Sequence, residues 1–195
     1  MILIPELSTV LILTPRTGSE TLRRALLAEY PKAVQIYRHM EADGVPQGYD
    51  SWRRIGVVRN PVDRLWSLYK FLGVINGPHD PAFIRAMRES AEREFSDWAL
   101  SNEVVFTSPY DRTDRGRFWP EFCVRHPLPE NRKSQRIYIR PDLGTEWWTF
   151  DDLESLADEL GVQLTHKRNA TGESHVAPLS PEAAAYIDRV HRWDF

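Results

Sequence analysis

Short apolar runs alternate along the chain with longer stretches in which apolar residues recur every three or four positions. Runs of the first kind predict β-strands, and the spacing of the second kind predicts amphipathic helices. The predicted strands cover Thr9 to Thr14, Ala33 to Tyr37, Ile55 to Val58, Val104 to Thr107 and Arg136 to Ile139. Regular alternation of strands and helices favours an α/β fold, with a mainly parallel central sheet flanked by helices.

Several helix ends are marked by their residue types. Thr17 and Glu20 fit a capping box, and Asn60 followed by Pro61 is a typical helix start. Other predicted helices cover Pro81 to Leu100, a segment capped by Asp151 and ended by Gly161, and a last segment that begins at Ser180-Pro181. In the helix after Asn60, the apolar stripe leaves Arg64, Ser67 and two other polar residues on other faces.

Length and composition predict a single domain over residues 1–195, because 195 residues with 42% hydrophobic content can bury a full core. The net charge of −3 argues against a general nucleic-acid-binding surface. One cysteine excludes a disulfide framework within the chain, and the histidines show no metal-ligand spacing. No apolar stretch reaches the length of a membrane span, so we expect a cytoplasmic protein without a membrane partner.

The turn between the first predicted strand and its helix has the composition of an anion-binding loop. Backbone N–H groups and the dipole at a helix start favour phosphate or sulfate there. Gly18 permits close approach of the backbone, and Arg16 offers a planar fork of donors. Thr17, Ser19 and Thr21 add hydroxyl groups.

A second loop follows the strand Ile55 to Val58 and carries Arg59 at its start. Ligands of parallel sheets bind beyond the carboxyl ends of the strands, so both loops are predicted to face one ligand. The first loop lacks the Gly-Lys-Ser/Thr ending of a P-loop and the glycine spacing of a dinucleotide fold, which disfavours an ATPase that uses lysine and magnesium.

Together the two loops resemble the donor-binding motifs of the sulfotransferases that use 3′-phosphoadenosine-5′-phosphosulfate (PAPS), in particular the carbohydrate type. Pro15-Arg-Thr-Gly-Ser-Glu-Thr-Leu22 is similar to their 5′-phosphosulfate loop, and Val58-Arg-Asn-Pro-Val-Asp-Arg-Leu-Trp-Ser-Leu-Tyr69 is similar to their 3′-phosphate motif. Weaker likeness extends through Ser134-Gln135, His166-Lys-Arg-Asn169 and the carboxyl-terminal residues. The resemblance implies a P-loop-like sulfotransferase fold that moves a sulfuryl group from PAPS to a hydroxyl or amine, releases PAP and needs no metal.

The resemblance also implies a role for each matching residue. Arg16 contacts the phosphosulfate and stabilises the leaving phosphate, and the rest of the loop completes the cradle. Arg59 and Ser67 hold the 3′-phosphate, and Lys167 or Arg168 closes over it. The donor-binding set is therefore Arg16, Thr17, Gly18, Ser19, Glu20, Thr21, Arg59, Ser67, Lys167 and Arg168.

His39, just after the second predicted strand, is the candidate general base, because imidazole titrates near neutral pH. Glu41 and Asp43 are alternative carboxylate bases. Glu20 departs from the family pattern, since an acid beside a phosphosulfate is unfavourable; it either caps the helix at Thr17 or points into the site as a different base.

Other functions also fit these residues. An ATP-dependent small-molecule kinase with a degenerate phosphate loop is one alternative, and a catalytically inactive nucleotide- or glycan-binding module is another. The acceptor is expected to be a small molecule or a glycan, and residue types alone do not name it.

Overall fold

The computed structural model of the chain describes residues 1–76, 81–109, 123–165, 176–192 and 194. The chain divides into two compact units, which are described separately below. Unit 1 comprises the described residues of Met1–Arg59, Thr107–Pro127 and Gln135–Arg168, and unit 2 those of Asn60–Phe106, Leu128–Ser134 and Asn169–Phe195. The single domain expected over residues 1–195 stays a prediction.

Unit 1 contains a five-stranded sheet with the strand order β3-β1-β2-β4-β7. The strands are β1 (Ile2–Ile4), β2 (Thr9–Ile12), β3 (Val34–Gln35), β4 (Arg53–Val58) and β7 (Glu146–Thr149). β2, β4 and β7 run parallel, whereas β1 is antiparallel to both of its neighbours. The predicted α/β class is confirmed, but the sheet is mixed, because the amino-terminal run bends back through a 3-10 turn at Pro5–Leu7.

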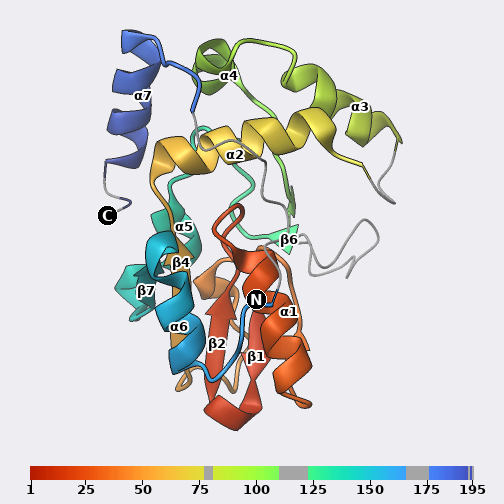
Figure 1. The fold of residues 1–195 in the computed structure, drawn as a ribbon, viewed down its shortest axis with the longest axis vertical. Coiled ribbons are helices and arrows are strands. Elements are labelled where there is room, and N and C mark those ends of the chain that lie inside the picture. Colours follow the sequence, from red (N-terminus) through yellow and green to blue (C-terminus); the bar gives the residue numbers. More distant parts are fainter. Residues whose placement is uncertain (77–80, 110–122, 166–175, 193, 195) are drawn as a thin grey trace. The chain divides into compact units, whose positions relative to one another are not determined.

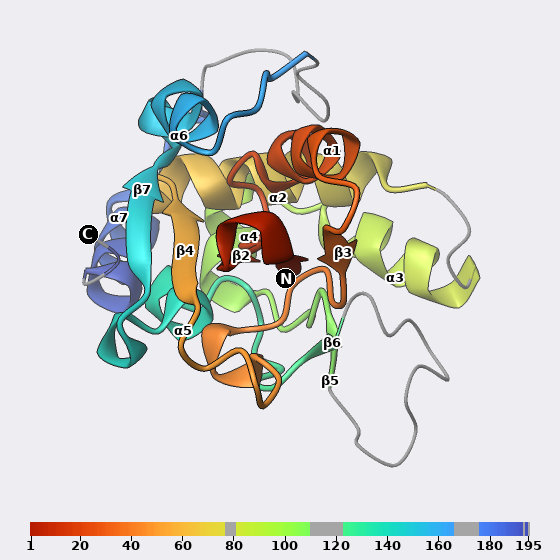
Figure 2. The ribbon, with the colours of Figure 1, turned by 90° about the horizontal axis from the view of Figure 1, so that it is seen from below.

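Helices cover both faces of this sheet (Figures 1 and 2). α1 (Ser19–Glu29) and α6 (Leu153–Glu159) lie on one face, and α5 (Gln135–Ile139) lies on the other. Alternate residues of each strand point to opposite faces. Ile2, Ile4, Leu11 and Leu13 therefore join the α1 and α6 core, while Met1, Leu3, Val10 and Ile12 pack with Met40, Ala42 and Cys123.

Unit 2 is helical and is built around α2 (Pro61–Val74), which contacts α3 (Pro81–Ser90), α4 (Phe95–Ser101) and α7 (Pro181–His191). The predicted cap of α2 and the predicted start of α7 are confirmed: the Asn60 side chain accepts from the N–H groups of Val62 and Asp63, and the Ser180 side chain accepts from Ala183 N–H. The core of this unit gathers α2, α3, α4 and α7 side chains around Leu65, Leu68, Leu72, Trp98 and Ile187.

Some predicted elements are wrong. Arg136 to Ile139 is not a strand but part of α5, where Tyr138 and Ile139 are buried and Ile139 packs against Gly56 of β4. Val104 to Thr107 is not a strand; the short strand β5 (Ser108–Pro109) follows it and pairs with β6 (Cys123–Val124). The helix expected over Pro81 to Leu100 is divided into α3 and α4.

Two predicted helix caps are also wrong, and so is the predicted exposure of two residues of α2. Gly18, not Thr17, is the N-cap of α1, and α6 begins at Leu153 without a side-chain cap from Asp151. Arg64 and Ser67 are buried, although the apolar stripe of α2 assigned them to other faces. Because α2 contacts three other helices, a larger part of its circumference is buried than a single apolar stripe would cover.

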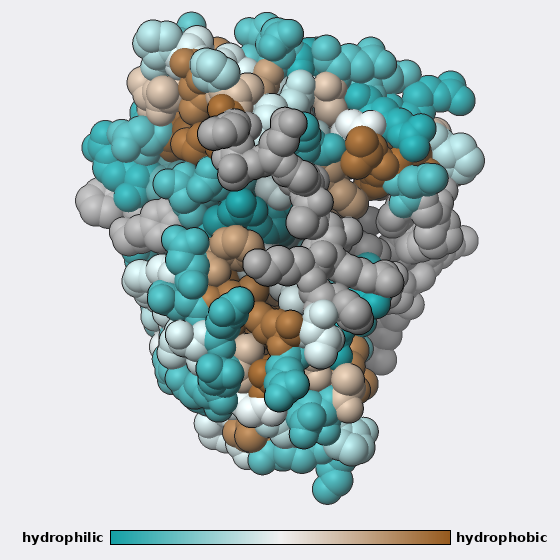
Figure 3. Space-filling model, viewed as in Figure 1, coloured by the Kyte–Doolittle hydropathy of each residue, from teal (hydrophilic) through white to brown (hydrophobic). Residues whose placement is uncertain are grey.

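Hydrophilic residues occupy much of the described surface on the face drawn in Figure 3. Among the described residues, the exposed large apolar ones are Leu7, Val34, Val74, Leu128, Leu143 and Trp147. Within the described part of the chain, no helix is long and apolar enough to cross a membrane.

Candidate functional site

The loop between β2 and α1 has an unusual backbone conformation. Arg16 has a φ of 67° and Gly18 a φ of 76°, both in the left-handed region. The Thr17 hydroxyl donates to the carbonyl of Thr14 at 2.9 Å and so tightens the loop, which explains why Thr17 does not cap α1. A non-glycine residue in this region is strained, and such strain is common where a loop is shaped for a ligand.

Gly18 is required here for two reasons. Its positive φ disfavours any side chain, and a Cβ at this position would lie 2.7 Å from Leu153 Cδ2 and 3.2 Å from Phe150 Cε2. The loop is therefore packed directly against the segment that follows β7. Ser19 and Thr21 lie on the first turn of α1, which starts immediately after this contact.

Arg16 and Arg59 are brought together at the carboxyl ends of the adjacent parallel strands β2 and β4. Arg59 Nη1 donates to the backbone oxygen of Arg16 at 3.5 Å. Burial, and then the positive charge of Arg59, lower the pKa of Arg16 to about 10. The Arg59 guanidinium carbon lies 4.5 Å from the ring centroid of Phe150. Two partly buried cations that are close enough for their charges to interact favour the binding of an anion.

Gln135 fixes the backbone at Arg59. Its Oε1 accepts from Arg59 N–H at 2.9 Å, and its Nε2 donates to the Arg59 carbonyl at 2.7 Å. The Gln135 side chain is fully buried, so both bonds are shielded from water. Sequence reasoning assigned Gln135 no role beyond a weak family likeness, because a bond between residues 76 positions apart leaves no local pattern.

His39 is buried after β3, and its Nδ1 lies 2.8 Å from the carbonyl oxygen of Leu13. A carbonyl only accepts, so Nδ1 carries the hydrogen in this bond. In the neutral ring the basic nitrogen is then Nε2. The hydrogen bond to Leu13, which directly follows β2, ties the candidate base to the start of the candidate anion loop.

Glu20 does not cap α1. Its carboxylate accepts from Arg23, Arg24 and Arg38 at distances of 2.6 to 2.9 Å. Burial alone would raise the pKa of Glu20, but these hydrogen bonds more than offset it and hold the pKa well below its ordinary value. Glu20 is thus ionised and engaged near neutral pH, which makes it a weak candidate for a base.

The bonds of Arg38 and His39 hold their segment at two points. Arg38 binds Glu20 on the first turn of α1, and His39 binds Leu13 at the end of β2. Residues 38 and 39 are therefore fixed against both sides of the loop that contains Arg16. The acid that follows this loop, Glu20, is bound by Arg38. This bond holds its carboxylate away from the position that a bound anion would occupy.

The two alternative carboxylate bases are engaged elsewhere. Glu41 is fully buried and accepts from the backbone N–H groups of Arg125 at 2.6 Å and His126 at 3.1 Å. Asp43 lies 3.0 Å from His126 Nε2 and 3.1 Å from Arg140 Nη1. Both carboxylates hold structure together, so His39 is the better candidate for the base.

The remaining predicted site residues belong to the other unit or lie outside the described residues. Ser67 lies on α2 in unit 2, where it is buried, and the chain passes from one unit to the other between Arg59 and Asn60. Lys167 and Arg168 lie outside the described residues. Among the residues that the structure describes, no three His, Cys, Asp or Glu side chains are grouped so that they could hold a metal ion.

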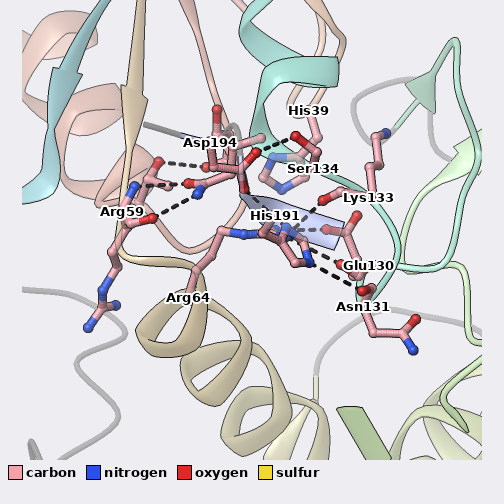
Figure 4. A network of polar contacts seen from close by, with 12 residues as sticks. His39, Arg59, Arg64, Glu130, Asn131, Lys133, Ser134, His191 and Asp194 are labelled. Atoms are coloured by element: carbon pink, nitrogen blue, oxygen red, sulfur yellow. Dashed lines mark hydrogen bonds and ion pairs between the residues drawn. The ribbon is translucent and has the colours of Figure 1, made fainter. Parts of the chain in front are cut away.

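A polar network in unit 2 was missed by sequence reasoning (Figure 4). Arg64 Nη1 pairs with Glu130 Oε2 at 2.9 Å, and both side chains are buried. His191 lies between Asp194 Oδ2, at 3.0 Å, and the carbonyl of Asn131, at 3.2 Å. The Ser134 hydroxyl donates to Asp194. The network therefore connects α2 and α7 to the segment of residues 128–134.

No protein-family model, no curated protein and no solved structure matches the chain. The assignment of function therefore depends on the residues and their geometry.

Proposed function

We propose that the chain is a PAPS-dependent sulfotransferase of P-loop-like fold. The observation that carries this proposal is the contact between Arg16 and Arg59 at the ends of β2 and β4. The two residues come from the two loops whose sequences resemble the phosphosulfate and 3′-phosphate motifs. A donor with phosphate groups at both ends of its ribose would neutralise both cations.

The reaction would be an in-line displacement at sulfur. The acceptor oxygen forms a bond to sulfur while the bond between sulfur and the bridging phosphate oxygen breaks, and the acceptor proton passes to His39 Nε2. Arg16 would stabilise the charge that develops on the departing phosphate. Arg59 would hold the 3′-phosphate, and positioning with electrostatic stabilisation would supply most of the rate.

The backbone supports this division of roles. Gln135 fixes Arg59 by two hydrogen bonds, and the contact of Gly18 with Leu153 fixes the loop that carries Arg16. A site that holds its cations in place before the ligand arrives loses less entropy on binding.

PAP titrations of the wild-type protein and of Arg59→Ala test the proposal. Loss of a charge-assisted bond of about 1.5–3 kcal/mol predicts roughly 10- to 150-fold weaker binding of PAP. Arg53→Ala is the matched control, because Arg53 lies at the other end of the same strand and pairs with Glu146 and Glu159. Equal PAP affinity in Arg59→Ala and the wild type would contradict the proposal.

A further inference from the structure

A cavity of about 360 Å³ lies beside α4 in unit 2. Its wall comes from the end of α3, from the turn between α3 and α4, from α4 itself and from the segment that follows α4 (Figure 1). Cavities of this size hold small molecules in many proteins. The polar and charged residues of the wall are Ser90, Arg93, Trp98, Ser101, Asn102 and Glu103.

Two buried side chains of this wall carry an N–H donor that lacks an acceptor. Trp98 is 1% exposed and Asn102 is 4% exposed. Within the described part of the chain, neither Trp98 Nε1 nor Asn102 Nδ2 has a hydrogen-bond partner. Asn102 Oδ1 accepts from Val104 N–H at 3.0 Å, and because a backbone N–H bonds only to the oxygen of an amide, the unpaired atom is the nitrogen.

The two donors belong to one side of α4. Asn102 is the C-cap of this helix, and its N–H donates to the carbonyl of Trp98 at 2.9 Å. Residues four positions apart are neighbours on a helix surface. A buried donor without an acceptor costs free energy, and an oxygen atom of a ligand in the cavity would remove that cost for both side chains.

The described wall also carries one positive and one negative side chain. Arg93, which is exposed in the turn before α4, donates through Nη1 to Ser101 Oγ at 3.0 Å. This bond positions the guanidinium, which has further N–H groups for a ligand. Glu103 lies 3.6 Å from Arg132, and both side chains are exposed, so the pair is weak. One charge of each sign favours a ligand that also carries one of each.

We propose that this cavity binds a small zwitterion, namely an α-amino acid with an apolar side chain. Its carboxylate accepts from Arg93, Trp98 and Asn102, and its ammonium group pairs with Glu103. Half-buried Val104 supplies an apolar wall for the side chain. Small side-chain adjustments are common on binding, and they would bring the two buried donors to the ligand carboxylate.

This inference is independent of the proposed function. The wall of the cavity includes neither Arg16 nor Arg59 and belongs wholly to unit 2. Failure of PAP to bind would therefore leave the inference standing, and failure of an amino acid to bind would leave the sulfotransferase proposal standing.

Calorimetric titrations of the full chain with three matched probes test the inference. L-leucine carries both charges, L-leucinamide lacks the carboxylate, and N-acetyl-L-leucine lacks the ammonium group. Leucine is expected to bind, and each of the two derivatives to bind at least tenfold more weakly, because each leaves one charge of the wall without its partner.

Two variants locate the binding in this cavity. Arg93→Gln is expected to weaken leucine binding by about tenfold or more, because it removes a charge-assisted bond. Arg192→Gln is the matched control: Arg192 is also an exposed arginine of unit 2, but it pairs with Asp188 and is not part of the wall. Trp98→Phe keeps an aromatic ring and removes the N–H group, so about three- to tenfold weaker binding is expected.

Thermal unfolding of each variant without ligand checks that it is folded, and Arg93→Gln, at an exposed position, decides the matter if Trp98→Phe is not. Absence of leucine binding by the wild type would overturn the inference. So would equal affinity for leucine and either derivative, or equal leucine affinity in Arg93→Gln and the wild type.

Discussion

Replacing Arg16 by methionine should stabilise the chain in the absence of ligand. Arg59 donates to the backbone oxygen of Arg16, and burial, together with the positive charge of Arg59, lowers the pKa of the Arg16 side chain to about 10. The shift corresponds to a cost of about 3 kcal/mol for the charged side chain. The side chain is partly exposed, so water and salt screen the charge, and the expected gain in the free energy of unfolding is about 1 kcal/mol.

For a chain of 195 residues, that gain corresponds to a rise in Tm of about 2–4 °C. The strained φ of 67° does not enter the comparison, because methionine also has a Cβ. Arg16→Lys is the control: it keeps a positive charge beside Arg59 and should not raise Tm. Thermal unfolding followed by circular dichroism, with and without PAP, measures both effects.

The same substitution should reduce the stabilisation that PAP gives, because the stabilisation of the folded state by a ligand grows with the logarithm of its affinity. The pH dependence has a defined sign. The pKa of Arg16 is lowered in the folded state, so the cost is present below about pH 10 and is relieved above it. The difference in Tm between Arg16→Met and the wild type should narrow above that pH. A lower Tm for Arg16→Met, with an unchanged response to PAP, would refute the reasoning.

Two other substitutions separate chemistry from stability. His39→Gln should keep the affinity for PAP, while the rate of sulfuryl transfer at a saturating acceptor concentration falls by about 100-fold or more. The reason is that glutamine cannot take the proton that Nε2 accepts. A rate equal to that of the wild type would exclude His39 as the base. Glu130→Ala should lower the free energy of unfolding by about 3–5 kcal/mol, because it leaves the Arg64 charge buried without its carboxylate. Urea denaturation measures this change. Glu103→Ala, at an exposed acid, should change it by less than about 0.5 kcal/mol, and similar losses in the two variants would contradict the role of the buried pair.

The sequence predicted the part of the fold that local patterns encode. The strand at Thr9, the helix start at Asn60 and the last helix at Ser180 are all confirmed, because capping residues and apolar spacing act within a few residues. The predicted strands that precede the two loops place Arg16 and Arg59 after strand ends, which is why the sequence alone pairs the two arginines as candidates.

Elements governed by distant contacts were predicted less well. The run at Arg136 to Ile139 is too short for periodicity to separate strand from helix. It is helical where Ile139 packs against Gly56 and Gln135 binds the backbone of Arg59. No glycine or proline marks the break between α3 and α4, so that break had no signal in the sequence.

Polar side chains with distant partners left no local pattern either. Arg64 pairs with Glu130, 66 positions away, so a surface position on α2 was the expectation from spacing alone. Glu20 was assigned to a cap or to the site, because Arg38 is not its neighbour in sequence. The bond between Arg38 and Glu20 becomes visible only when α1 and the segment after β3 are placed side by side.

Calorimetric titration of the wild-type protein with PAP, compared with ADP and with ATP plus magnesium, tests the central claim most directly. The pairing of Arg16 with Arg59 predicts tight binding of PAP and much weaker binding of ADP, which lacks the 3′-phosphate. Preference for ATP with magnesium, or equal affinity for PAP and ADP, would contradict the assignment of Arg59 to a 3′-phosphate and with it the sulfotransferase function.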